Sequence, residues 1–450
     1  MARISILTAR FHQSVELFDN QPIAFDLGNG NLGIKDMRNI YFSEDLRHAV
    51  PWKYRTFTEG MWSIDKAYAK TARELCKHHF KDIDSPRKLS EDRVIYGGGD
   101  RYLMDFAHHL QQDGHEVTVF EEYGPVPGFN GPYEQQIVKE YEGVKFVCMF
   151  QQPNNGVEAL NRNFNQLSVY ADLRVYFVSS LCVPEVRNPA VAISHGIFWD
   201  SPYLSYKDMT REQRFDWLQK QMIGFTLPDY VVAVDHNVRN VIQAIEPGAE
   251  CRITVIPNYV DTKKFHPKEK DWEGIRVLFA RRSTLIRGWN LFSTAAKNLP
   301  QYEFIACGDA TRKDQQDDLE AAASRAIPNL RQTHKHMNDM PALYQSVDIN
   351  TVPTMAAEGL SLSLLEGMAC GLPTITTNVG GIGDATLDRL NSFIFNPYQQ
   401  DMTDAVRLLA ENEGLRKELG AMARETSLRF DENEVWWPKW RQIIPPKVTP

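Results

Sequence analysis

The chain has 450 residues, of which 43% are hydrophobic and 24% are charged, and its formal net charge is -8. This length predicts about two or three domains with a sizeable core. The negative charge argues against a nonspecific nucleic-acid-binding protein, because such proteins present a basic surface. No stretch approaches the roughly 20 apolar residues that span a membrane, although peripheral contact with a membrane stays open.

The six cysteines form no CxxC pair, and most of them lie in apolar segments. They are Cys76, Cys148, Cys182, Cys251, Cys307 and Cys370. This usage is typical of reduced core residues in a protein of the cytosol. The N-terminal residues also lack the apolar core of a signal peptide. The sequence therefore predicts a cytoplasmic location.

The amino-terminal half predicts an α/β domain that carries a large insertion. A short β-prone run at 3–10 is expected to form the first strand. An irregular region follows at about 11–92, and its segment 62–80 has helical spacing, so we interpret the region as an insertion with its own small helical part. Regular alternation then resumes with a glycine-rich turn and a helix. The apolar face of that helix carries Leu103, Phe106, Ala107 and Leu110.

A GxGxxG pattern lies inside the insertion, at Gly28, Gly30 and Gly33. A dinucleotide-binding fingerprint needs a strand before these glycines and a long helix after them. The preceding segment is only weakly β-prone, and the following segment is a poor helix. We therefore interpret the three glycines as a turn.

The rest of the chain alternates between apolar β-prone runs and amphipathic segments, which predicts parallel sheets covered by helices. Proline and asparagine within 252–267 suit a connection between domains. We expect two doubly wound domains in tandem, at 1–258 and 259–429. The aromatic tail at 430–450 is expected to dock on the amino-terminal domain. In the first domain, β-prone runs lie at 143–150, 173–180 and 189–196, and a strand, turn and helix lie at 228–245.

Two glutamates, Glu358 and Glu366, flank the start of a predicted helix in the segment "EGLSLSLLEGMACGLPTITTNVGG". This helix is expected to start near Ser361, which places Glu358 in the loop at the carboxyl edge of the sheet, where open α/β sheets bind ligands. Free N–H groups in the first turn favour a phosphate, and the carboxylate of Glu366 can accept hydrogen bonds from a ribose diol. The alternative is a dipole partner with a half-buried glutamate, which does not explain the flanking glycines. The buried face is expected to carry Leu362, Leu365 and Ala369.

Two further segments place anion-binding groups at the ends of predicted strands. Arg282 and Arg287 follow a strand in "VLFARRSTLIRG", and two guanidiniums there suit a diphosphate. Gly98 and Gly99 belong to "YGGGDRY", which opens a helix whose N-terminus favours an anion. The alternatives are a solvated basic loop for the first segment and a tight strand–helix turn for the second.

These segments together resemble the retaining GT-B glycosyltransferases of family four, also described as glycosyl transferases group 1. The resemblance covers about 93–429 and the first strand, and its carboxy-terminal motifs are the most specific. Besides the acidic motif, the arginine loop and the glycine loop, it rests on "VIPNYVDTKKFHP" between the domains and on "ALYQSVDINTVPT" before the acidic motif. It implies two Rossmann-like domains that face a central cleft.

The resemblance also implies roles by position. Arg282 and Arg287 would bind the donor diphosphate, Glu366 the ribose and Glu358 the transferred sugar. His195, in "ISHGIFWD", would lie near the sugar or the acceptor, although a histidine at a strand end is more often structural. The backbone groups expected to line the phosphate site belong to Gly98, Gly99, Gly359, Leu360, Ser361 and Leu362.

Two features depart from the family pattern. The resemblance implies a glycine where Arg281 stands and a lysine where Arg287 stands, which leaves the preferred donor open. The insertion at about 11–92 occupies a place where the family has a few residues, which leaves the acceptor site open.

The sequence therefore predicts a transferase that moves a sugar from a nucleoside diphosphate sugar to a hydroxyl acceptor, with retention of configuration. The acceptor would be a glycan, a lipid-linked glycan or a small molecule. No metal and no other cofactor is expected, because no Asp-x-Asp stands where a metal-dependent sugar transferase would carry one. Two alternatives stay open: a nucleotide-sugar epimerase of the same fold, and a non-catalytic nucleotide-sugar-binding protein.

Overall fold

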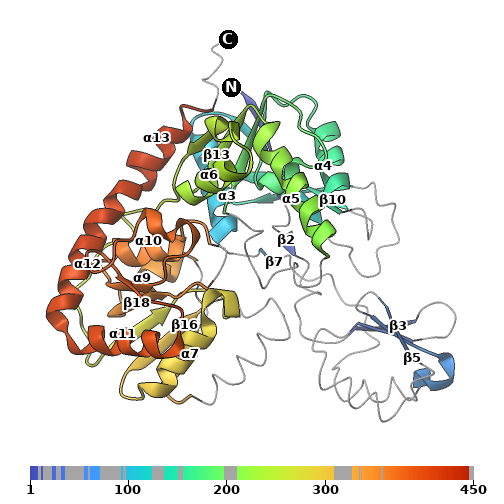
Figure 1. Cartoon of the computed structure of the whole chain (residues 1–450). Helices are drawn as coiled ribbons and strands as arrows, with labels where there is room; N and C mark the ends of the chain where they lie inside the picture. Colours follow the sequence, from blue (N-terminus) through green and yellow to red (C-terminus); the bar gives the residue numbers. More distant parts are fainter. Residues whose placement is uncertain are drawn as a thin grey trace. The chain divides into compact units, whose positions relative to one another are not determined.

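The computed structural model of the chain (Figure 1) divides into two compact units. One unit comprises Met1–Phe11, Ile95–Asp309 and Glu320–Pro450, and the other comprises His12–Val94 and Ala310–Leu319. The structure describes residues 1–8, 12–13, 23–26, 32–35, 55–58, 61–70, 93–94, 98–123, 136–150, 156–196, 210–308, 327–333, 335, 337–355 and 358–444.

The amino-terminal part of the first unit is an eight-stranded sheet in the order β14-β13-β12-β11-β1-β8-β10-β9. All neighbouring strands are parallel except β9, which pairs antiparallel with β10 at one edge. The strands are β1 (Arg3–Leu7), β8 (Glu116–Tyr123), β9 (Gln136–Tyr141), β10 (Val144–Phe150), β11 (Leu173–Tyr176), β12 (Ala190–Ser194), β13 (Tyr230–Ala233) and β14 (Ile253–Val255). The central strands β11 and β12 are buried along their whole length, as expected when both faces of a parallel sheet are covered.

Four α-helices of the described residues connect these strands. They are α3 (Gly98–Gln112), α4 (Gly156–Leu167), α5 (Arg211–Thr226) and α6 (His236–Ile245). Helix α3 buries the predicted face, including Leu103, Phe106, Ala107 and Leu110. The short 3-10 turns η3 (Ser179–Cys182) and η6 (Ala249–Arg252) complete this part. The predicted connection at 252–267 is wrong at its start, because β14 is an edge strand of the sheet, and Pro257 comes only after that strand ends.

The carboxy-terminal part is a six-stranded parallel sheet in the order β17-β16-β15-β18-β19-β20. Its strands are β15 (Arg276–Phe279), β16 (Glu303–Cys307), β17 (Leu330–Thr333), β18 (Ile349–Val352), β19 (Thr374–Thr376) and β20 (Phe393–Ile394). Its α-helices among the described residues are α7 (Trp289–Asn298), α9 (Met340–Tyr344), α10 (Leu362–Ala369), α11 (Gln399–Glu411) and α12 (Glu413–Ser427). The 3-10 turns are η7 (Leu285–Arg287), η8 (Met337–Asp339), η9 (Gly380–Asp384) and η10 (Leu428–Phe430).

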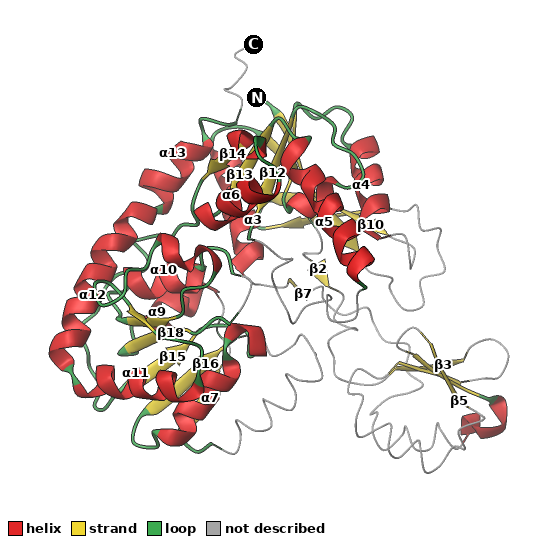
Figure 2. Ribbon diagram, viewed as in Figure 1, coloured by secondary structure: helices red, strands yellow, loops and turns green. Residues whose placement is uncertain are grey.

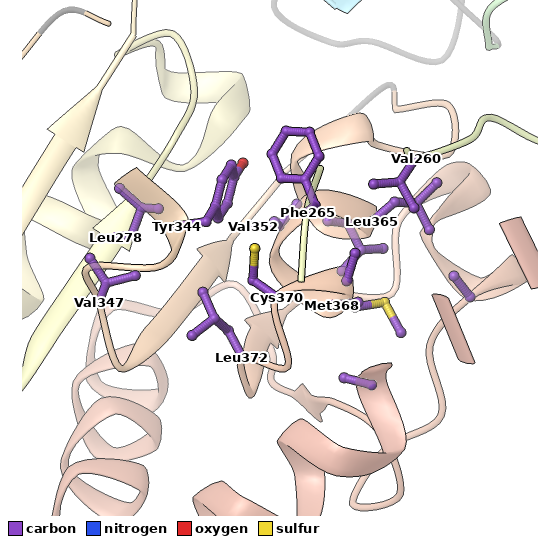
Figure 3. Close-up of a cluster of buried hydrophobic side chains, with 14 of the residues drawn as sticks. Val260, Phe265, Leu278, Tyr344, Val347, Val352, Leu365, Met368, Cys370 and Leu372 are labelled. Carbon is purple, nitrogen blue, oxygen red and sulfur yellow. The ribbon is translucent and has the colours of Figure 1, made fainter. Parts of the chain in front are cut away.

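Two hydrophobic clusters bury the two faces of this second sheet. Figure 2 shows β15, β16 and β18 with α10 on one side and with α7 and α11 on the other. On the α10 side, Leu365 and Met368 pack with Val352 of β18 and with Phe265 from the segment between the sheets (Figure 3). On the other side, α7 and α11 bury residues that include Phe292 and Val406. The predicted architecture of two α/β domains with parallel sheets is therefore confirmed.

The carboxy-terminal tail contacts helix α3 of the amino-terminal sheet. After α12, the chain forms a π-helical turn, η11 (Glu432–Trp436), and a short helix, α13 (Trp437–Trp440). The indole of Trp440 donates a hydrogen bond to the Tyr102 hydroxyl at 3.1 Å. Arg441 makes two hydrogen bonds to the Asp113 carboxylate, at 2.6 and 2.7 Å. These contacts join the end of the chain to the amino-terminal domain.

The second unit contains an antiparallel four-stranded sheet in the order β3-β4-β6-β5. Its strands are β3 (Ile23–Asp26), β4 (Leu32–Lys35), β5 (Arg55–Thr58) and β6 (Met61–Ile64). The predicted helix at 62–80 is therefore wrong at its start. Residues 61–64 have the aromatic and β-branched composition of a strand, the helix occupies 66–70, and 71–80 lie outside the described residues.

The GxGxxG pattern does not open a helix. Gly33 lies within β4, opposite Phe25 of β3, while Gly28 and Gly30 lie outside the described residues. A strand at the third glycine, where the fingerprint needs the start of a helix, excludes the geometry of a dinucleotide-binding fingerprint. The two ends of the insertion meet, because β2 (His12–Gln13) pairs antiparallel with β7 (Arg93–Val94). In the described part of the chain, no helix is both long and apolar enough to cross a membrane.

Candidate active site

The acidic motif and the arginine loop meet at the carboxyl edge of the second sheet. Strands β15 and β18 are parallel neighbours, so the residues that follow them emerge at the same edge. Arg281 comes two residues after β15, Thr354 comes two residues after β18, and Glu358 precedes α10. The topology thus brings side chains that are more than seventy residues apart in sequence into direct contact.

Glu358 is held by two arginines and a threonine. Its side chain is 10% exposed, and its Oε2 atom forms ion pairs with Arg281 and Arg287. The Thr354 hydroxyl donates to the same oxygen at 3.0 Å. Among the described residues, no hydrogen-bond partner contacts Oε1. Burial opposes ionisation, but the two arginines outweigh it and hold the pKa of Glu358 below its usual value. The carboxylate is therefore charged at neutral pH and has one oxygen left to accept hydrogen bonds.

The pair Gly380–Gly381 lies directly under the Glu358 loop. Gly380 has a φ of 58°, and a Cβ atom there would lie 2.0 Å from the carbonyl oxygen of Glu358. The N–H of Gly381 donates to that carbonyl at 3.0 Å. Only glycine permits both this backbone conformation and this close approach. The double glycine of the motif therefore fixes the backbone that carries Glu358.

Helix α10 begins as predicted, with Ser361 as the residue before its first turn. The Ser361 side chain does not cap the helix, and its hydroxyl lies 3.0 Å from the Ser363 hydroxyl instead. The N–H groups of the first turn thus donate no hydrogen bond to this side chain, and the positive end of the helix dipole favours an anion. Leu360 is buried, and its carbonyl accepts a hydrogen bond from Asn258 of the segment between the sheets.

Glu366 lies one turn inside α10, and an arginine of the other sheet's domain contacts it. Arg101 of α3 forms an ion pair with Glu366 and also contacts Asp105 at 3.3 Å. The guanidinium of Arg101 lies over the ring of Tyr259, with 5.9 Å between its central carbon and the ring centroid. Burial raises the pKa of Glu366, and Arg101 offsets only part of this effect. The sequence motif "GGGDRY" contains Arg101, but nothing in it indicates a partner 265 residues away.

The two arginines predicted to bind a diphosphate differ in their surroundings. Arg287 ends the turn η7 and contacts Glu358, whereas Arg282 is exposed. Gly288 follows with a φ of 82°, and a Cβ atom there would lie 2.0 Å from the carbonyl oxygen of Pro353. This glycine therefore allows the turn that positions Arg287 against the end of β18. Sequence analysis did not predict that Arg281 also contacts Glu358.

His195 follows strand β12 of the first sheet and is neutral at pH 7. Its Nε2 atom lies 2.9 Å from the carbonyl oxygen of Phe177, so Nε2 must donate the hydrogen bond. Burial lowers the pKa of His195 to about 4. The Tyr102 ring packs edge-on against the imidazole, with 5.0 Å between centroids. The remaining nitrogen, Nδ1, is therefore an acceptor.

The glycines of both halves bring the two domains into close contact around this motif. A Cβ atom on Gly359 would lie 2.5 Å from the carbonyl oxygen of His195, so the two backbones touch. A Cβ atom on Gly98, at the start of α3, would lie 3.4 Å from Cδ1 of Leu362. Gly99 has open space at the equivalent position. The glycine loop, His195 and the start of α10 therefore lie together.

Asp235 is a further buried acid at this contact, which sequence analysis did not identify. It is the N-terminal cap of α6, and its Oδ1 accepts from the Val238 N–H at 2.9 Å. Its buried Oδ2 has no hydrogen-bond partner within the described part of the chain. Burial, together with the nearby Asp384, raises the pKa of Asp235 to about 6. The sequence signal, an acid between a strand and a helix, indicates only a cap.

The described residues hold no group of three or more His, Cys, Asp or Glu side chains that could bind a metal ion. What the site does offer is an ionised carboxylate, a buried carboxylate, cationic side chains and an uncapped helix start. Such a combination can bind an anion next to a polyhydroxylated group.

Comparison with known proteins identifies similar sequences over most of the chain. The family model described as "Glycosyl transferases group 1" matches residues 261–426, and the model "Glycosyltransferase Family 4" matches residues 96–264. A D-inositol 3-phosphate glycosyltransferase of Paenarthrobacter aurescens is 29% identical over 194 residues, which is 38% of this chain and 46% of the relative. An uncharacterised glycosyltransferase of Methanocaldococcus jannaschii is 33% identical over 99 residues, which is 21% of this chain and 27% of the relative. The chain thus spans less than half the length of these two curated relatives.

Solved structures with the same fold cover more of the chain. Sucrose-phosphate synthase from Thermosynechococcus elongatus superimposes with a TM-score of 0.62 at 16% identity, covering 77% of this chain and 94% of that structure. HepE of Anabaena in complex with UDP-glucose has a TM-score of 0.62 at 17% identity, covering 78% of this chain and 96% of that structure. At these identities the likeness concerns the fold.

Proposed function

Because the chain belongs to the GT-B glycosyltransferases of family four, we propose that it transfers a sugar from a nucleoside diphosphate sugar to a hydroxyl acceptor, with retention of configuration. One observation carries this proposal: the ionised Glu358 lies between Arg281 and Arg287, just before an uncapped helix that also carries Glu366. This arrangement offers cations to a diphosphate and carboxylates to the hydroxyl groups on both sides of it.

The donor diphosphate would bind at Arg282, Arg287 and the first turn of α10. Arg287 would turn from Glu358 toward the diphosphate, and the exposed Arg282 would approach from the same loop. Two guanidiniums and a helix N-terminus provide charge-assisted hydrogen bonds to phosphate oxygens. Backbone groups of Gly98, Gly99 and Gly359–Leu362 would line the same site.

The two glutamates would hold the sugars on either side of the diphosphate. Glu366 would accept hydrogen bonds from the ribose diol, either in addition to its contact with Arg101 or in exchange for that contact. Glu358 would accept a hydroxyl of the transferred sugar at Oε1, because the arginines and Thr354 occupy Oε2. His195 would accept a further hydroxyl at Nδ1, since its Nε2 proton is committed to Phe177.

In the reaction, the bond between the anomeric carbon and the diphosphate oxygen breaks, and a bond from the acceptor oxygen forms on the same face. The acceptor's proton passes to the departing diphosphate. The protein's part is to orient the two reactants and to stabilise the negative charge that develops on the leaving group. Arg282, Arg287 and the helix dipole would supply this stabilisation.

We propose that the reaction needs no metal ion, because arginines and a helix start suffice to neutralise a diphosphate. Activity should survive EDTA. Abolition by EDTA with recovery on addition of Mg²⁺ or Mn²⁺ would contradict this part of the proposal. We also propose that the protein acts in the cytoplasm. Its described cysteines are free thiols, and the cytosol keeps thiols in the reduced form.

A screen of nucleotide sugars tests the proposed function. Thermal unfolding would be measured with UDP-, GDP- and dTDP-hexoses, and the stabilising donors would then be incubated with candidate hydroxyl acceptors. We expect one class of donor to raise the melting temperature and to yield a glycosylated acceptor with free nucleoside diphosphate. A free, altered sugar formed without an acceptor would favour an epimerase, and stabilisation without any turnover would favour a binding protein.

A further inference from the structure

Arg281 replaces the glycine that the family resemblance implies, and its side chain is buried at the centre of the site. The residue is 9% exposed, and both terminal nitrogens of its guanidinium are engaged. Nη1 donates to the Thr354 hydroxyl and Nη2 donates to Glu358. A Cβ atom on Gly308 would lie 2.0 Å from the carbonyl oxygen of Arg281, so the backbone there is closely packed as well.

An additional arginine in a donor site has two possible uses. It can bind an extra negative charge on the transferred sugar, or it can hold another protein group in place. The first use requires a guanidinium that reaches the ligand, as the exposed Arg282 can. Arg281 instead directs both terminal nitrogens to protein acceptors, and its partner Thr354 is fully buried and itself hydrogen-bonded to Glu358. The contacts therefore favour the second use.

The charges around Glu358 indicate what this arrangement achieves. If Arg287 were its sole cationic partner, then turning Arg287 toward a diphosphate would leave a largely buried carboxylate uncompensated, which is costly. With Arg281 in place, Glu358 keeps a buried cation and the Thr354 hydroxyl on Oε2. Arg287 can then turn away from Glu358 while Glu358 keeps both its negative charge and its position.

We propose that Arg281 is a positioning residue that fixes Glu358 toward the transferred sugar and thereby releases Arg287 for the donor diphosphate. This inference rests on the proposed function of the same site, and it adds the residue that keeps the sugar-binding glutamate in place. Arg281 itself makes no contact with the donor.

A double-mutant cycle between Arg281 and Glu358 tests this role. The variants are Arg281→Met, Arg281→Lys, Glu358→Gln and the Arg281→Met/Glu358→Gln double variant. For each, kcat and KM are measured with the hexose nucleotide that binds the parent, and calorimetry compares that nucleotide with its nucleoside diphosphate. Arg281→Met should lower kcat by on the order of 10²-fold, as expected for a misplaced positioning group. In the Glu358→Gln background the same substitution should lower kcat by less than about 3-fold, because the effects of two residues that act through one another are not additive.

The conservative variant and a matched control separate positioning from general damage to the fold. Arg281→Lys keeps a charge near Glu358 and should recover part of the lost kcat, whereas Arg281→Met should not. Arg331 of β17 lies in the same domain, pairs with Glu303 at 3.3 Å and is exposed. Arg331→Met should leave kcat and KM unchanged, and thermal unfolding of all variants shows which of them are folded at the assay temperature.

Each outcome bears on the inference. An equal loss from Arg281→Met in the parent and in the Glu358→Gln background would overturn it. So would a parent that prefers a hexuronic acid nucleotide over the neutral hexose and loses that preference in Arg281→Met, since Arg281 would then contact the donor. If no hexose nucleotide in the panel binds the parent, the proposed function itself fails. If the parent binds a hexose nucleotide and Arg281→Met has the same kcat as the parent, only the proposed role of Arg281 is refuted.

Discussion

Glu358 and Glu366 are two glutamates of one short segment whose surroundings act on them in opposite directions. Arg281 and Arg287 hold the pKa of Glu358 below its usual value, while burial raises the pKa of Glu366 despite the contact with Arg101. Glu358 is thus an anion at neutral pH, held between two cationic side chains. Glu366 is a buried acceptor whose partner comes from the other domain.

Glu366→Ala should weaken binding of the bare nucleoside diphosphate by roughly 1.5–3 kcal/mol, the value of hydrogen bonds to a charged group. The reason is the loss of the ribose contacts, and calorimetry measures it directly. Glu413 is exposed and pairs with Lys417 in α12, so Glu413→Ala serves as the control and should bind as the parent does. Unchanged affinity in a folded Glu366→Ala variant would rule out the ribose role.

If Arg282 and Arg287 stabilise the leaving diphosphate as proposed, then Arg282→Ala and Arg287→Ala should each lower turnover by on the order of 10²-fold or more. Steady-state kinetics with a saturating donor measures the effect. Arg287→Ala also removes a cationic partner of Glu358, so the pKa of Glu358 should rise toward its usual value. The acid limb of the pH profile of kcat/KM should then move to higher pH. Activity of both variants within a few-fold of the parent would refute the assignment.

Asp235 should make the stability of the protein depend on pH. Its folded-state pKa is about 6, whereas an unfolded aspartate has a pKa of about 3.9. A raised folded pKa contributes stability that is present below about pH 4 and is lost as the pH rises through about 6. Asn at this position can still cap α6 but does not titrate. The free energy of unfolding of the parent, relative to Asp235→Asn, should therefore fall by roughly 2.4 kcal/mol between pH 4 and pH 7.5.

Chemical denaturation at several pH values measures this difference. His236→Gln is a useful comparison, because His236 contacts Asp384 at 3.0 Å and its substitution leaves Asp235 in place. A difference between the parent and Asp235→Asn that stays constant across this pH range would show that Asp235 is not perturbed in the folded protein.

Among the elements of the amino-terminal domain, strand β1 is the one that precedes the insertion. Strand β1 is parallel to β11 and β12, so β1 ends at the same edge of the sheet as the strand that precedes His195. The insertion follows β1, and its two ends pair through His12 and Val94. From the place of the insertion in the sequence, after the first strand, we predict that transfer to the acceptor depends on it.

Replacing residues 12–94 by a short glycine-containing linker tests this proposal. The pairing of His12 with Val94 means that a short linker can join the two ends. Donor binding should remain within a few-fold of the parent, because its groups lie outside the deleted segment, while transfer to the acceptor should fall sharply. A folded deletion variant that keeps the parent's acceptor kinetics would show that the insertion is not needed for transfer.

The elements that sequence patterns predict best are those set by local composition. The buried strands at 173–176 and 190–194 are continuous apolar runs, and the start of α10 at Ser361 is marked by its flanking serine and glycines. Strand β6 was predicted as a helix, because its apolar residues continue into a segment with helical spacing. The antiparallel edge strand β9 has no local signal that separates it from a parallel one.

The residues of the candidate site also differ in how far the local sequence predicts them. Glu358, Glu366, Arg282 and Arg287 are found from spacing, because the ends of neighbouring strands in a parallel sheet must meet. The contacts of Arg101 with Glu366 and of Arg281 with Glu358 depend on how distant segments pack, and no periodicity encodes them. Asp235 has the signature of a helix cap, and its raised pKa depends on burial, to which Gly359 and Gly381 of the other domain contribute, and on Asp384.

At the scale of the whole molecule, the two sheets contribute different parts of one site. The first sheet supplies His195, Arg101 and the glycine loop, and the second supplies Glu358, Glu366 and the arginines. The segment at 255–260 links them, with Asn258 bonded to Leu360 and Tyr259 donating to Asp105 at 2.6 Å. The returning tail adds the contacts of Glu432 with His109, at 2.9 Å, and of Arg441 with Asp113. If this is the active site, we expect transfer to require both domains.

We propose that the protein moves a sugar from a nucleotide to a hydroxyl group. Proton NMR of the complete reaction tests it most directly, because the anomeric signals of donor and product report both transfer and configuration. With an α-linked hexose nucleotide and an acceptor, we expect an α-linked glycoside that appears at the rate at which nucleoside diphosphate is released, and we expect this signal to be lost in Glu358→Gln. A β-linked product, or conversion of the donor to a different free sugar without any acceptor, would contradict the proposed function.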